Sequence, residues 1–176
     1  MNRLIPRQSI PELSIETLNG PWTLSEQTPE NFTMIVVYRG YHCPICKMYV
    51  TELNKLLEEF ESRAVSVLAL SSDTRERAQL TADEWQLDKL TIGYGLSEKQ
   101  SQEWGLFRSA SRGKTSLGIE EPAMFTEPGL FLVRPDGTLY WSNISTMPFA
   151  RPHFREILGA LDFALKNDYP ARGELI

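Results

Sequence analysis

The chain has 176 residues, of which 41% are hydrophobic, and a formal net charge of −5. This length predicts one well-filled core, with residues 1–176 forming a single domain, and the negative charge argues against nucleic acid or an anionic membrane as a partner. No apolar stretch approaches the roughly 20 residues that cross a bilayer, and the N-terminus lacks the apolar core of a signal peptide, so we expect a cytoplasmic protein.

Strand and helix patterns alternate through the first half of the chain. Residues 11–25 predict an N-terminal β element with a turn at 19–21, and the apolar run at 34–38 predicts a central strand covered on both faces. A second apolar run, at 65–70, predicts another strand, and Asp73 is a candidate N-cap for a helix through Trp85. Between the two runs, apolar residues recur every three or four positions and predict an amphipathic helix: Ile45, Met48, Tyr49, Leu53, Leu56, Leu57 and Phe60.

The second half predicts a short strand at 90–94, a helix opened by the capping box of Ser97 and Gln100, and a late hairpin with its turn at 134–137. A final amphipathic helix follows Pro152. Residues 107–127 have no clear period, which is typical either of a long loop that lines a site or of a disordered segment. Helices and strands in this order predict a layered α/β fold with a mixed sheet.

The two cysteines of the chain form the motif Cys43-Pro44-Ile45-Cys46 between a predicted strand and a predicted helix. Cytoplasmic thiols are held reduced, so a close pair there is more often catalytic or metal-binding than a structural disulfide. If the helix begins at Pro44, Cys43 is its N-cap, and free backbone N–H groups and the helix dipole favour the Cys43 thiolate. Cys46 lies one turn further, more buried and less activated. These positions predict that Cys43 attacks and Cys46 resolves the product.

Two neighbouring residues could lower the pKa of Cys43 further. His42 precedes the cysteine directly, and Arg39 stands at the end of the strand. Each has a plainer alternative, which is an exposed turn residue for His42 and an ion pair with a surface carboxylate for Arg39. A zinc site would need four ligands, whereas the chain has two cysteines and two poorly placed histidines. We therefore expect neither a metal nor a cofactor.

The chain resembles the peroxiredoxin-like branch of the thioredoxin superfamily, near the alkyl hydroperoxide reductase/thiol-specific antioxidant proteins. The stretches that carry the resemblance are 11–25, the redox motif at 38–46, the strand at 67–73 and the late hairpin at 127–137. The resemblance implies a thioredoxin-like α/β fold, a central mixed β-sheet flanked by helices, with an N-terminal β-hairpin extension. By the same likeness, Cys43 matches both the peroxidatic cysteine and the first cysteine of a thioredoxin motif.

Two positions depart from the family pattern. Gly40 stands where peroxiredoxins carry a threonine or serine, and Pro128 stands where they present an arginine. In the family those groups bind and polarise the peroxide, so Arg39, Arg134 or Arg151 would have to substitute. Pro128 also falls where thioredoxins place a cis-proline facing the disulfide.

Three functions therefore compete. The first is a thiol-dependent peroxidase in which Cys43 attacks a peroxide, Cys46 resolves, and a thioredoxin- or glutathione-type reductant regenerates the pair. The second is a thioredoxin-like oxidoreductase that acts on protein disulfides, and the third is a non-catalytic redox-sensing domain. Peroxiredoxin relatives often dimerise, so the resemblance also allows a homodimer.

Overall fold

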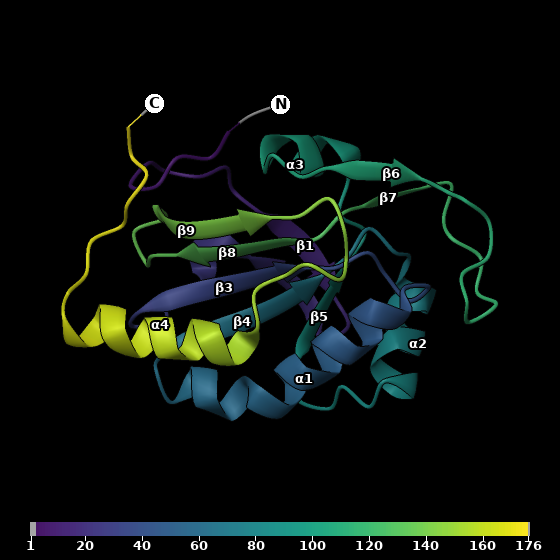
Figure 1. Cartoon of the computed structure of the whole chain (residues 1–176), viewed down its shortest axis with the longest axis horizontal. Helices are drawn as coiled ribbons and strands as arrows, with labels where there is room; N and C mark the ends of the chain where they lie inside the picture. Colours follow the sequence, from purple (N-terminus) through teal and green to yellow (C-terminus); the bar gives the residue numbers. More distant parts are fainter. Residues whose placement is uncertain (1–2, 176) are drawn as a thin grey trace.

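A seven-stranded mixed sheet forms the centre of the molecule (Figure 1). The computed structural model describes residues 3–175. The strand order is β2-β1-β5-β4-β3-β8-β9, in which β3 runs parallel to β4 and antiparallel to β8. The bounds are β1 Ser14–Thr17, β2 Gly20–Thr23, β3 Phe32–Val37, β4 Val65–Leu70, β5 Thr91–Tyr94, β8 Gly129–Val133 and β9 Leu139–Ile144. The predicted mixed α/β sheet is confirmed, and the N-terminal hairpin β1–β2 extends one edge of it.

Helices cover both faces of this sheet. The helices α1 (Pro44–Glu61) and α4 (Phe154–Lys166) lie side by side on one face, whereas α3 (Glu98–Glu103) lies on the opposite side (Figure 1). The helix α2 (Arg75–Glu84) packs beside β5, and a 3-10 helix occupies Leu24–Glu26. Within residues 3–175, no helix is long and apolar enough to cross a membrane.

The central strand β3 is buried at all six positions, as the sequence predicts. Alternate residues point to opposite faces of a strand, so β3 contributes to two cores. Met34 and Val36 belong to the cluster that contains the apolar faces of α1 and α4, and Ile35 and Val37 belong to the cluster around Trp104. Because neighbours hold β3 on both edges and both faces, the turn that follows it has a fixed starting point.

Three local predictions need correction. Residues 107–127 are not one long loop, because β6 (Arg108–Ala110) pairs with β7 (Met124–Thr126) in a separate two-stranded sheet. Asp73 does not cap α2, since the Thr74 side chain accepts the capping hydrogen bond from the Arg77 N–H. Met48 is 70% exposed although it fits the apolar repeat of α1, because it lies outside the face that contacts the sheet. The capping box at Ser97 is confirmed.

Candidate active site

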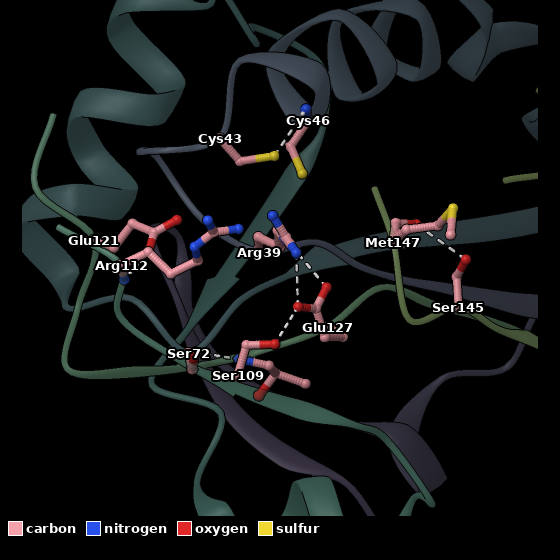
Figure 2. A network of polar contacts seen from close by, with 11 residues as sticks. Arg39, Cys43, Cys46, Ser72, Ser109, Arg112, Glu121, Glu127, Ser145 and Met147 are labelled. Carbon is pink, nitrogen blue, oxygen red and sulfur yellow. Dashed lines mark hydrogen bonds and ion pairs between the residues drawn. The ribbon is translucent and has the colours of Figure 1, made fainter. Parts of the chain in front are cut away.

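Both cysteines lie in the first turn of α1, just after the end of β3 (Figure 2). Cys43 is the N-cap and Pro44 the first helical residue, as predicted. The Cys46 N–H donates a hydrogen bond of 3.3 Å to the Cys43 sulfur, which is the capping interaction expected at this position. Both cysteines are buried, and neither is in a disulfide.

The surroundings of the two thiols shift their acidities in opposite directions. A hydrogen bond from the Cys46 side chain, and then one from its backbone N–H, lower the pKa of Cys43 against the effect of burial, and the charges of Arg39 and Arg151 add to this. Burial, followed by the hydrogen bond to Cys43, raises the pKa of Cys46 well above its ordinary value. A thiolate forms first on Cys43, while Cys46 stays protonated and donates to it. This matches the predicted difference between the two sulfurs.

Arg39 forms an ion pair with a buried carboxylate rather than a surface one. Its Nε and Nη2 each donate a hydrogen bond of 2.7 Å to Glu127, which is 2% exposed. The Ser109 hydroxyl donates a third hydrogen bond to the same carboxylate, and the Arg39 guanidinium also lies over the Phe125 ring. Figure 2 shows Arg39 between the cysteines and Glu127. The pair therefore anchors the β6–β7 hairpin beside the thiols, and the charge of Arg39 still lowers the pKa of Cys43.

His42 is neither an exposed turn residue nor a cation beside Cys43, so both interpretations of it were wrong. Its side chain is completely buried and packs against Phe125, with 4.7 Å between the ring centroids. Burial, and then the charge of Arg77, lower its pKa from 6.5 to about 4. Near neutral pH the imidazole is therefore uncharged, and its contribution is to the packing of the turn.

Gly40 adopts a backbone conformation that side chains rarely allow, with φ of +132°. A Cβ atom at this position would lie 2.5 Å from Oδ2 of Asp73. That carboxylate cannot easily move, because it accepts a 2.7 Å hydrogen bond from the Tyr41 N–H and lies 3.0 Å from Nε of Arg77. A hydroxyl-bearing side chain is therefore incompatible with the turn as it is built here.

Pro128 differs from its sequence-based expectation. The peptide bond before it is trans, as are all those of the described residues, so it is not a cis-proline. The Glu127 N–H donates a hydrogen bond to the Phe107 carbonyl, and the chain then continues into β8. This route uses the trans form, which is the favoured form of an X–Pro bond. The Pro128 carbonyl accepts a 3.0 Å hydrogen bond from the Ser145 N–H, which ties it to the loop after β9.

Of the two later arginines named as substitutes, only Arg151 reaches the site. It lies in the loop between β9 and α4, and its Cζ is 3.8 Å from the centre of the Tyr49 ring. Arg134 lies beyond Val133, at the opposite end of β8 from Gly129, and stacks on Tyr140. Sequence reasoning allowed that residues 107–127 line a site but did not single out Glu127, Ser109 or Phe125, because no local pattern shows that their hairpin folds back onto the cysteines.

The model of the AhpC/TSA family matches residues 6–142, which include the hairpin β1–β2, the redox motif and β8. The chain belongs to the AhpC/TSA family. A curated relative, a 1-Cys peroxiredoxin of Dictyostelium discoideum, is 28% identical over 156 residues. The alignment covers 88% of this AhpC/TSA chain but only 58% of that relative, so the chain spans little more than half of its length.

Solved structures with the same fold include peroxiredoxins and a thiol:disulfide interchange protein. Peroxidoxin BcpB from Mycobacterium tuberculosis superposes with a TM-score of 0.71 at 17% identity, covering 92% of this chain and 98% of that one. A putative thiol:disulfide interchange protein DsbE from Chlorobium tepidum superposes with a TM-score of 0.66 at 16% identity, covering 92% and 98%. At identities this low, the superpositions show one thing, which is that the AhpC/TSA chain shares the thioredoxin-like fold of these proteins.

Proposed function

We propose that this AhpC/TSA protein is a thiol-dependent peroxidase in which Cys43 attacks and Cys46 resolves. The observation that carries the proposal is the difference between the two sulfurs: the Cys43 pKa is lowered at the N-cap of α1, and the Cys46 pKa is raised by burial. A thiolate is the nucleophilic form of cysteine, and family membership supports peroxide as its target.

The reaction proceeds in three balanced steps. The Cys43 thiolate attacks the terminal oxygen of a hydroperoxide, the O–O bond breaks, and the other oxygen leaves as an alkoxide that takes a proton from water. The resulting sulfenic acid condenses with the Cys46 thiol to form a disulfide and release water. An external dithiol, of thioredoxin or glutathione type, then reduces the disulfide to complete the cycle. We place this chemistry in the cytoplasm, where dithiols are kept reduced.

The test is stopped-flow oxidation of the reduced protein by hydrogen peroxide, followed by coupled turnover with thioredoxin and its reductase. We expect Cys46→Ser to accumulate a sulfenic acid on residue 43 that a dimedone probe labels, and Cys43→Ser to be inert. Failure of the reduced wild-type protein to consume hydrogen peroxide or an organic hydroperoxide would end this proposal.

A second function is favoured by Gly40. The turn leaves no room for the hydroxyl that binds peroxide in the family, whereas both cysteines needed for disulfide exchange are present, one helical turn apart. The protein would then act as a dithiol–disulfide oxidoreductase on protein disulfides. In that case the reduced Cys46→Ser variant traps a mixed disulfide with disulfide-bonded insulin, and the wild-type protein catalyses insulin reduction. The lowered pKa of Cys43 argues against the third function, a non-catalytic redox sensor.

A further inference from the structure

A cavity of about 370 Å³ opens between β9, α4 and the tail that follows α4. Its volume lies in the range of roughly 300–1,000 Å³ that is typical of small-molecule sites. Neither cysteine lines it, and Leu132, which does, lies near the end of β8 that is away from Gly129. We propose that this cavity binds a small aliphatic carboxylate, with the hydrocarbon chain inside and the carboxylate at Arg172. This binding is separate from the proposed thiol chemistry.

Hydrophobic side chains make the walls of the cavity. Leu132, Ile157 and Leu161 are each at most 5% exposed, so they form its inner wall. Phe163 and Tyr169 also line it but are 58% and 42% exposed, with ring centroids 5.8 Å apart, so they stand at its rim. A hydrocarbon chain in the cavity would remove apolar surface of both kinds from water, which is the main favourable contribution to binding of this type.

Contacts with the rest of the fold hold the tail that closes the cavity. Figure 1 shows this tail leaving the end of α4 and rising past β9. The Tyr140 hydroxyl donates a 2.9 Å hydrogen bond to the Tyr169 carbonyl, and Nε of Arg7 donates one of 2.8 Å to the Ala171 carbonyl. These two contacts lie on either side of Pro170, which lines the cavity. The cavity is therefore preformed, and a ligand does not have to order the tail in order to bind.

The charges around the rim favour an anionic head group. Arg172 lines the cavity, and its side chain forms no salt bridge with any of residues 3–175. Glu174, two residues further along the tail, pairs with Arg7 at 3.5 Å. A second guanidinium, that of Arg134, lies 4.9 Å from the centre of the Tyr140 ring, which also lines the cavity. A carboxylate at the rim would pair with Arg172, whereas an alkylammonium would be repelled by both cations.

One acidic side chain near the cavity opposes an anion. Burial raises the pKa of Tyr140; the charge of Arg134 lowers it and that of Asp168 raises it. Both charges therefore reach a ring that lines the cavity. Replacement of Asp168 by asparagine removes the repulsion, and asparagine tolerates the left-handed backbone at this position, where φ is +46°. This variant gives the proposal a direction that a purely apolar site would not show.

The test is equilibrium dialysis of the whole chain with decanoate, decan-1-ol and decylammonium, three probes of equal chain length, below their micelle concentrations. Trp141 lines the cavity, so its emission locates the bound probe. Arg172→Gln removes the proposed partner of the carboxylate, and Arg75→Gln, at an exposed position of α2, is its matched control. Ala160→Phe fills the cavity from α4, whereas Leu165→Phe places a ring on the same helix outside the lining residues.

We expect one decanoate to bind per chain and to change the tryptophan emission, and Trp141→Phe to abolish that change while binding continues. Arg172→Gln should weaken decanoate binding about fivefold, the upper end for an exposed ion pair, and leave decan-1-ol binding unchanged. Asp168→Asn should bind decanoate more tightly. Ala160→Phe should bind neither probe, whereas Leu165→Phe and Arg75→Gln should bind both as wild type does.

Four results would overturn the proposal. Equal affinities for decanoate and decylammonium, or equal effects of Arg172→Gln and Arg75→Gln, would remove the role of Arg172. Decanoate binding that survives Ala160→Phe would place the ligand elsewhere. An emission of Trp141 that changes with protein concentration in the absence of decanoate would assign the cavity to an interface between two copies of the chain. A protein that binds decanoate but consumes no peroxide refutes the peroxidase alone.

Discussion

Replacement of Gly40 by alanine tests why this chain lacks the hydroxyl that its family places before the reactive cysteine. The backbone at Gly40, with φ of +132°, costs a residue with a side chain about 1–3 kcal/mol. The new Cβ would also displace the Asp73 carboxylate, which lies 2.5 Å from its position. Loss of the hydrogen bond from the Tyr41 N–H to that buried carboxylate adds about 1–3 kcal/mol.

Gly20 is the matched control, because its φ of +116° is similar but a Cβ there would have no atom within 4 Å. We expect Gly20→Ala to lose only the backbone part of the free energy of unfolding and Gly40→Ala to lose about 1–3 kcal/mol more. The measurement is urea denaturation at equilibrium with linear extrapolation. Equal losses in the two variants would refute the argument from Asp73. Gly40→Thr, which restores the family's residue type, should destabilise the protein rather than speed peroxide reduction.

Three further substitutions probe the groups around the thiols. Cys46→Ala removes the largest influence that lowers the pKa of Cys43, so the pH midpoint for alkylation of Cys43 by iodoacetamide should rise; an unchanged midpoint would contradict this. Arg39→Met leaves the Glu127 carboxylate buried and unpaired, which should cost about 3–5 kcal/mol in urea denaturation, and a second change, Glu127→Leu, should restore much of it. Burial holds the pKa of His42 at about 4, below its ordinary 6.5, so its neutral form contributes stability that is fully present above pH 6.5 and is lost as the pH falls toward 4. His42→Phe should remove about 3 kcal/mol from the change in the free energy of unfolding between pH 6.5 and pH 4. If the free energy of unfolding of the variant falls with pH in parallel with that of wild type, the assignment is wrong.

Much of the fold is predictable because its signals are local. The apolar run at 34–38, most of which lies in β3, and the helical repeat of α1 reflect burial of those same residues, so the pattern and its cause lie in one stretch of chain. The capping box of Ser97 and Gln100 likewise involves neighbours only three residues apart. Residues 107–127 defeat such reasoning, because β6 and β7 are three residues each and pair across a stretch with no periodic pattern.

The sequence by itself determined that a strand leads into Cys43-Pro44-Ile45-Cys46 at the start of a helix, which makes Cys43 the N-cap and separates the two sulfurs by one turn. Only the tertiary structure decided which charged side chains lie near those sulfurs. Arg39 pairs with a carboxylate 88 residues away, and Arg151 reaches the motif from 106 residues beyond Ile45. The physical reason is that capping depends on backbone geometry within one turn, whereas burial and ion pairing depend on which distant segments pack together.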